Sequence, residues 1–316
     1  MMKRLVVGLS VMSLLLCWST AFAAFPDKPV VIAVGRSPGG STDVIARTFA
    51  PFFSKYLKTP VVVQNVQGAG GQIALREVYN SKPDGYELIL SVFPSDVITQ
   101  VLKRPSYDMR KFIHIYGISG RDTNGIIVPY DSQFKSFPDL LKASKESPIS
   151  LSSTQIGSNS WLLAILLRQK IGFKYRYVAY EGGGESVMAL VGGHVTACVS
   201  NTIDFPRLAK EKRIRVLAVA SSNRVDYLPD VPTFKELGYP NVITNTRQGI
   251  AAPPGLPSDI KKVLSNAAAK AVADPEFLKI ASSFTVDAMA AEEMQKEATA
   301  TYDEIAQLLK EAGEIK

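Results

Sequence analysis

Short runs of β-branched residues alternate with longer amphipathic stretches through most of this 316-residue chain. The first run, Val30 to Val34, is followed by apolar residues at helical spacing, among them Ile45, Phe49 and Phe53. Such a run is typical of a buried strand, and residues three and four apart share one face of a helix. Repetition of strand and helix predicts an α/β fold with largely parallel sheets.

The same pattern predicts further elements. Strands are expected at 61–64, 86–91, 125–128, 175–179, 195–200 and 215–220, and helices at 71–79, 136–140, 161–169, 185–191, 258–273 and 290–310. Prolines between residues 229 and 257 indicate a segment of turns. Two sets of βα units without a disordered linker predict two lobes, and open α/β sheets bind ligands beyond the carboxyl ends of their strands.

The N-terminal segment 1–23 has the features of an export signal. Lys3 and Arg4 precede an apolar run over residues 5–18, and Ala21-Phe22-Ala23 places small residues at the cleavage positions. The alternatives are an uncleaved membrane anchor and a lipid on Cys17. The run is short against the roughly twenty residues of a spanning helix, so we expect cleavage near Ala24. About 293 residues would then remain, enough for two domains.

Composition excludes several classes of protein. Cys198 is the one cysteine left after cleavage, so the exported chain would lack a disulfide framework, and its apolar surroundings favour a buried hydrophobe over a nucleophile. The formal charge of +7 falls to about +5 without Lys3 and Arg4. The basic residues form short groups without an aromatic platform, which argues against nucleic-acid binding. A mild positive field suits anionic ligands.

Two glycine-rich loops follow neighbouring predicted strands and each opens a helix. The first is Ser37-Pro38-Gly39-Gly40-Ser41-Thr42-Asp43 and the second is Gln67-Gly68-Ala69-Gly70-Gly71. Glycine lets the backbone approach a ligand closely, and a helix N-terminus offers unpaired N–H groups to an anion. Either loop alone is equally compatible with a tight turn. Together they predict an anion-binding site in one crevice.

Small polar residues and glycines, all neutral except Asp204, occupy the matching positions of the second lobe. They are Ser152, Ser153, Thr154, Gly157, Ser158 and Asn159, then Gly182 to Gly184, then Ser200, Asn201, Thr202 and Asp204. Such a lining can hold a polar ligand through many modest hydrogen bonds. It offers little for acid, base or metal chemistry.

An enzyme is the alternative class, because Gly35-Arg36-Ser37-Pro38-Gly39 matches the Gly-x-Ser-x-Gly nucleophile elbow. The residue after the serine must donate its backbone N–H to the oxyanion, and Pro38 has none. His114 and His194 are the only candidate bases, and each is expected to be structural. Neither loop has dinucleotide or phosphate-loop spacing, and no clustered ligands suggest a metal. We therefore expect no catalytic residue, metal or cofactor.

An ordered series of motifs resembles the solute receptors of tripartite tricarboxylate transporters, the Bug or TctC-like proteins. The motifs are Phe25-Pro26-Asp27-Lys28-Pro29, the two glycine-rich loops, Pro83-Asp84-Gly85-Tyr86, Tyr180-Glu181-Gly182-Gly183-Gly184, Arg215-Val216-Leu217-Ala218-Val219, Leu228-Pro229-Asp230-Val231-Pro232-Thr233-Phe234 and Ala252-Pro253-Pro254-Gly255. Each motif is weakly specific, but their shared order along nearly the whole mature chain is strongly so.

The resemblance implies a periplasmic "Venus flytrap" receptor with two α/β lobes, each a mostly parallel sheet flanked by helices. The first domain would comprise residues 24–122 and 227–316, and the second residues 123–226. The expected ligand is a small carboxylate, delivered by a monomeric receptor to the membrane permease subunits of the transporter. A receptor that only senses its ligand, and an exported hydrolase, remain alternatives.

The resemblance also implies site residues. Those expected around the carboxylate are Ser37, Gly39, Gly40, Ser41, Thr42, Gly70, Gly71 and Ser91, and those expected to face the rest of the ligand are Thr154, Ser158, Asn159, Gly184 and Asp204. Three positions depart from the family pattern: Arg36, Trp161 and Arg247. The guanidinium of Arg36 or Arg247 could pair with a second carboxylate or lie on the solvated surface.

Overall fold

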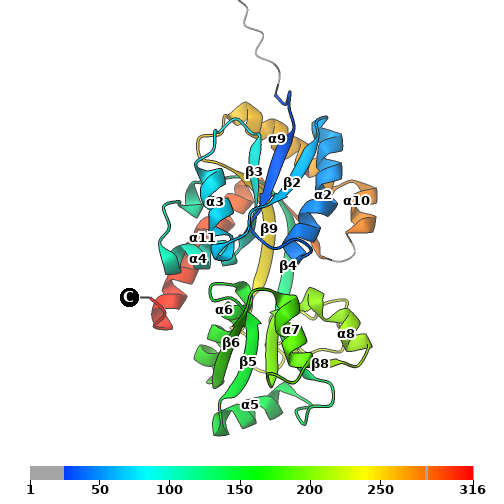
Figure 1. Cartoon of the computed structure of the whole chain (residues 1–316), viewed down its shortest axis with the longest axis vertical. Coiled ribbons are helices and arrows are strands. Elements are labelled where there is room, and N and C mark those ends of the chain that lie inside the picture. The colour runs from blue at the N-terminus through cyan, green and yellow to red at the C-terminus, as the bar shows by residue number, and fades with distance from the viewer. Residues whose placement is uncertain (1–24, 282–283, 316) are drawn as a thin grey trace, which may run out of the picture.

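Two lobes lie one above the other in the computed structural model, which describes residues 25–281 and 284–315 (Figure 1). The export signal predicted at 1–23 lies outside this description, as do the side chains of Arg121 and Asp204. Two long strands run between the lobes. The predicted two-lobed α/β architecture is confirmed.

The first lobe is built on three parallel strands. They are β1 (Val30–Val34), β2 (Val61–Asn65) and β3 (Glu87–Phe93), in the order β2-β1-β3. The helices α2 (Ser41–Leu57), α3 (Gln72–Tyr79) and α4 (Ser95–Lys103) follow these strands in turn. The carboxyl ends of all three strands, and the helices that begin there, therefore lie at one edge of the sheet.

Helices from the C-terminal part complete this lobe. They are α9 (Ser258–Val272), α10 (Pro275–Ile280) and α11 (Ala291–Glu311). The buried stripe of α2 packs against α9, and Phe49 stacks on Phe53 at 5.1 Å between ring centroids. The fully buried Phe277 of α10 meets Phe49 edge-on. Burying several aromatic side chains holds α2, and thus the loop before it, in place.

The second lobe repeats the parallel arrangement. Its strands are β5 (Ile149–Thr154), β6 (Tyr175–Tyr180) and β7 (Ala197–Asn201), and its helices are α5 (Phe137–Glu146), α6 (Asn159–Leu166), α7 (Gly183–Val191) and α8 (Pro206–Lys210). Ser136 caps α5 in a reciprocal capping box with Asp139, as its position predicted. β6 and β7 pair in parallel on either side of β5.

The strands β4 (Ile113–Pro129) and β9 (Asn245–Ala252) change the predicted sheet type. β9 is antiparallel to both β3 and β4, while β7, β8 (Ile214–Val219) and β10 (Val286–Ala290) are antiparallel to β4. The expectation of mostly parallel sheets thus holds for three strands in each lobe, and the described sheet as a whole is mixed. The reason is that the chain crosses from the first lobe to the second along β4 and returns along β9, so these two strands run in opposite directions.

The chain returns from the second lobe later than the predicted boundary at 226. The N–H of Phe234 donates to the carbonyl of Val219, and that of Thr244 donates to Ala220. The Phe234 ring also packs edge-on against Phe137 at 4.9 Å. The segment up to about residue 244 therefore packs on the second lobe.

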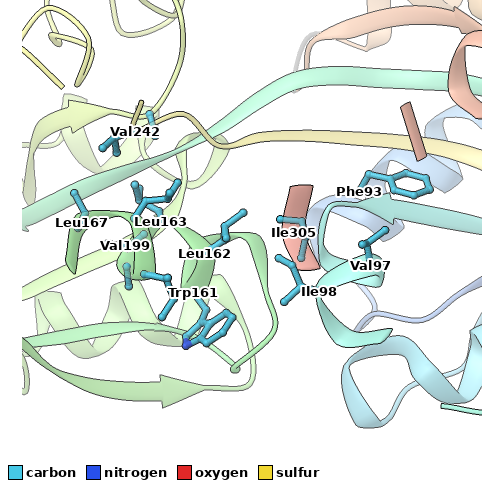
Figure 2. Close-up of a cluster of buried hydrophobic side chains, with 14 of the residues drawn as sticks. Phe93, Val97, Ile98, Trp161, Leu162, Leu163, Leu167, Val199, Val242 and Ile305 are labelled. Carbon is cyan, nitrogen blue, oxygen red and sulfur yellow. The ribbon is translucent and has the colours of Figure 1, made fainter. Parts of the chain in front are cut away.

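A shared apolar cluster joins the lobes beside the crossing strands. Figure 2 shows Ile98 of α4 and Ile305 of α11 on one side, with Leu162 and Trp161 of α6 on the other. All four belong to one buried cluster. Burial of their apolar surface stabilises the observed arrangement of the lobes.

The predicted strands and helices are found with shifts of a few residues at their ends, and the segment predicted at 125–128 is the second half of β4. The elements α4, β5, α8, β9, α10 and β10 were not predicted. β9 has the sequence NTRQGIAA, which has no strand-like alternation, and pairs on both sides with other strands. Its strand form therefore depends on tertiary pairing rather than on local propensity.

Candidate functional site

A cleft of about 390 Å³ lies between the lobes. Its walls come from the loops that follow β1, β2, β5 and β6, from the starts of α2, α4, α6 and α7, and from residues of β3, β4, β7 and β9. The predicted crevice at the carboxyl ends of the strands is therefore present. Most of its lining residues are glycine or carry a neutral polar group.

The first loop leads into the start of α2. Gly39 has φ +77°, a left-handed conformation that glycine adopts without strain, and the N–H of Gly40 donates to the carbonyl of Ser37. Gly40 is the N-cap and provides no side-chain hydrogen bond to the helix. The hydroxyl of Ser41, which lines the cleft, has no partner among the described residues. Donors and the positive end of the helix dipole therefore face the cleft.

A buried carboxylate fixes this loop from behind. Asp43 accepts hydrogen bonds from the Gly39 N–H at 2.9 Å, from the Asn65 amide at 2.8 Å and from Arg47. Burial raises the pKa of Asp43, but these hydrogen bonds outweigh burial and hold the pKa below its ordinary value. The loop is thus braced before any ligand arrives.

The second loop turns back at Gly68, whose carbonyl accepts from the N–H of Gly71. Gly71 has φ +91°, and a Cβ built there would lie 1.9 Å from the Arg36 guanidinium. The hydroxyl of Ser37 donates to Gln67 at 3.3 Å and links the two loops. The left-handed conformation favours glycine at position 71, and any larger residue there would also displace the Arg36 guanidinium.

Arg36 connects the second loop to α4. It donates to the Gly70 carbonyl at 2.6 Å and to Asp96 at 2.9 Å. Asp96 also accepts from the Ser91 hydroxyl and the Val92 N–H. The positive charge of Arg36 is therefore balanced by a buried carboxylate on the same lobe.

On the second lobe, hydroxyl and amide groups converge at the start of α6. Thr154 donates to Ser158, and Ser158 accepts from the N–H of Trp161 as the helix cap. The backbone N–H of Asn159 donates to the Ser95 hydroxyl at 3.1 Å, and the side-chain amide of Asn159 donates to the Thr246 hydroxyl at 2.6 Å. These bonds hold the second wall against α4 and β9.

The structure brings most predicted site residues to the cleft. Its walls include Arg36, Ser37, Gly39, Gly40, Ser41, Thr42, Gly70, Thr154, Ser158, Asn159 and Gly184. Gly71 and Ser91 lie behind this lining, where Gly71 contacts Arg36 and the fully buried Ser91 supports Asp96. The backbone of Asp204 belongs to a short 3-10 turn, and its side chain lies outside the description.

Arg247 lies away from the cleft lining. It forms ion pairs with Asp287 at 2.8 Å and with Glu297 at 2.9 Å, so it ties β9 to β10 and α11. This placement corrects the hypothesis that Arg247 could pair with a second carboxylate of the ligand. The charge of its guanidinium is already balanced by these two carboxylates of the first lobe.

Sequence reasoning missed several lining residues. They include Gln67, Ser95, Thr99, Asn124, Ser160, Glu181, Thr246 and Gln248. Gln67 and Glu181 stand in motifs that pointed to the site, so their position alone could have suggested them. Thr246 and Gln248 lie on the unpredicted β9, and no local pattern placed them there.

Catalytic groups are not assembled at the described cleft. His114 is fully buried on β4 against Phe93, and burial lowers its pKa to about 4. Neither His114 nor His194 lines the cleft. Among residues 25–281 and 284–315, no group of three or more histidine, cysteine or acidic side chains is placed to hold a metal.

Comparison with known proteins gives a consistent result. Residues 45–313 match the family model described as the tripartite tricarboxylate transporter family receptor. Protein BugT of Bordetella pertussis is 32% identical over 235 residues, which cover 73% of this chain and 72% of BugT. Within the described part of the chain, no helix is long and apolar enough to cross a membrane.

Solved structures share the fold. The periplasmic binding protein BugD superposes with a TM-score of 0.83 at 28% identity, covering 92% of this chain and 99% of BugD. A protein of R. palustris solved with adipate superposes with a TM-score of 0.83 at 25% identity, covering 92% and 98%. The similarity extends through both lobes.

Proposed function

The chain belongs to the tripartite tricarboxylate transporter receptor family, and we propose that it binds a small carboxylate in its cleft and delivers it to the membrane permease subunits of such a transporter. Proteins of this family are solute receptors. A structural neighbour was solved with adipate, a carboxylate. We place this receptor in the periplasm, with its export signal removed after Ala23.

The observation that carries the proposal is the uncapped start of α2 at the cleft wall. Ser41 presents a hydroxyl that has no partner among the described residues, and the N-cap Gly40 provides no side-chain acceptor for the first turn. A carboxylate placed there would accept from these N–H and O–H groups. We assign Ser37, Gly39, Gly40, Ser41, Thr42 and Gly70 to this carboxylate subsite, with Gly71 and Ser91 as supporting residues.

The second lobe supplies the remaining contacts. Thr154, Ser158, Asn159 and Gly184 lie on the opposite wall, and we assign them to the rest of the ligand together with the backbone of the turn at Asp204. A ligand that contacts both walls favours the closed arrangement by differential binding. The β4 and β9 strands are the connections about which the lobes would move.

We infer that the receptor acts without catalysis. The serine in the elbow-like sequence is followed by Pro38, which has no N–H to donate, and the buried His114 lies outside the cleft lining. The fixed groups of the first-lobe wall are donors suited to an anion rather than a nucleophile with its base.

A thermal-shift screen of carboxylic acids on the mature protein tests the proposal. A ligand that binds only the native state stabilises it by roughly 2.7 kcal/mol at a hundred times its dissociation constant. We expect at least one carboxylate to raise Tm and to be recovered chemically unchanged. Turnover of the ligand, or stabilisation by uncharged analogues alone, would contradict the proposed function.

A further inference from the structure

The charges on the cleft wall are unequal between the lobes. Among the described residues that line the cleft, Arg36 and Glu181 are the charged ones. Arg36 is paired with Asp96 and bonded to the Gly70 carbonyl. Glu181 is exposed and makes no hydrogen bond or ion pair with any described residue. The described wall therefore has an unbalanced negative charge on the second lobe.

This charge limits what the far end of a ligand can be. A second carboxylate would meet Glu181 without a free cation beside it, and like charges in a partly enclosed site repel. An ammonium group would instead form a charge-assisted hydrogen bond with it. The charge pattern thus disfavours dicarboxylates and favours a cationic nitrogen.

Two further features of the wall agree with a ligand that carries hydrogen-bond donors. The buried amides of Asn159 and Gln248 line the cleft, and each has an oxygen without a hydrogen-bond partner among the described residues. Ile156, with 58% of its surface exposed, lies on the same lining and offers apolar contact. Unused acceptors and an apolar side chain suit an alkyl chain that ends in N–H groups.

We propose that the ligand is a carboxylate that carries an ammonium group at its other end, as in an ω-amino acid. This inference rests on the proposed function. The carboxylate binds the first loop at the start of α2, and the ammonium group binds Glu181 across the cleft. Because these groups stand on opposite lobes, the two charges of the ligand are separated by a short alkyl chain rather than held on one carbon.

The test is isothermal titration of the mature protein at pH 7 with two series of probes. The first series comprises ω-amino acids with three to six carbons, and the second comprises dicarboxylates of matched length. We expect one ω-amino acid to bind about tenfold or more tightly than its matched dicarboxylate, the difference that one charge-assisted hydrogen bond supplies. Preference for dicarboxylates at every length would overturn the inference and leave the carboxylate receptor intact. Failure of both series would count against the inference, and failure of the wider carboxylic-acid screen as well would count against the proposed function.

Variants at Glu181 separate charge from shape. Glu181→Gln should weaken binding of the ω-amino acid about tenfold, and Glu181→Lys should reverse the preference in favour of the dicarboxylate. Glu185→Gln is the matched control, since Glu185 is exposed in the first turn of α7 and lies outside the cleft lining. Unchanged preference in Glu181→Lys, with Tm retained, would overturn the assignment.

Discussion

The two walls of the cleft are built by different means. The first-lobe wall consists of glycine-rich backbone fixed from behind by two buried carboxylates, Asp43 and Asp96. The second-lobe wall consists of hydroxyls, amides and glycines at the starts of α6 and α7, and Glu181, its one charged side chain among the described lining residues, has no partner among them. We infer that the first wall is preorganised for a constant group, the carboxylate, and the second wall selects the variable part of the ligand.

The largest expected effect comes from removing the brace of the first wall. Asp43→Ala leaves the Gly39 N–H without its acceptor and removes one of the two acceptors of the Asn65 amide. Losing hydrogen bonds to a buried charge should lower the free energy of unfolding by about 3 kcal/mol and weaken ligand binding about a hundredfold or more. Calorimetric titration and urea unfolding measure the two effects.

Asp139→Ala is the matched control for Asp43→Ala. It removes the carboxylate that completes the capping box of α5, on the second lobe and outside the cleft lining. Because Asp139 is exposed, its loss should lower the stability only slightly, with affinity retained. Equal loss of affinity in both variants would show that general destabilisation, and not the first loop, controls binding.

The next prediction concerns β4, the strand that joins the walls. Burial raises the pKa of Asp122 to about 6, while burial lowers that of His114 to about 4. Asp122 therefore holds its proton in the folded state between pH 4 and 6, which makes stability fall as pH rises. His114 takes its proton only on unfolding between pH 6.5 and 4, which makes stability rise with pH. Each contribution is about 3 kcal/mol, so the two largely cancel.

Single substitutions should reveal each half of this balance. Asp122→Asn leaves the His114 contribution, so the free energy of unfolding should increase more steeply between pH 4 and 6 than in the natural protein. His114→Phe leaves the Asp122 contribution, so the free energy of unfolding should decrease with pH between pH 4 and 6, relative to the natural protein. Urea unfolding across this pH range measures both slopes. Parallel slopes in all three proteins would contradict the prediction.

A smaller effect is expected from Arg36, which holds the second loop rather than the ligand. Arg36→Ala removes the bonds to Gly70 and Asp96 and should weaken binding about thirtyfold without abolishing it. Arg247→Ala, which removes another paired arginine outside the cleft lining, should leave affinity unchanged. Complete loss of binding in folded Arg36→Ala would make its guanidinium the anchor of the ligand.

Local sequence patterns were sufficient for the framework and for the two loops. β1 and α2 follow from short-range periodicity, and glycines before a helix indicate where backbone can face a ligand. The ion pairs of Arg36 and Arg247 could not be predicted in this way. Each depends on acids distant along the chain: Asp96 for the first, Asp287 and Glu297 for the second. Long-range pairing likewise explains why Thr246 and Gln248 of β9 were missed.

The smallest effect is expected from Ser41, and it distinguishes a residue of the first wall that contacts the ligand from residues that only support the loop. Ser41→Ala deletes one hydroxyl that lines the cleft and has no partner among the described residues. Since Gly40 and not Ser41 is the N-cap, the helix should keep its stability to within a few tenths of a kcal/mol. Binding of a carboxylate ligand should weaken about tenfold, the value of one charge-assisted hydrogen bond.

The matched control lies on the same helix. Ser54→Ala removes a hydroxyl that donates to the Thr59 carbonyl near the far end of α2, so it should reduce stability and spare affinity. Because Ser41 differs from Ser54 in facing the cleft, the ratio of the two dissociation constants isolates the contact. An unaltered dissociation constant in Ser41→Ala would move the carboxylate away from the start of α2 and remove the distinction between the two walls.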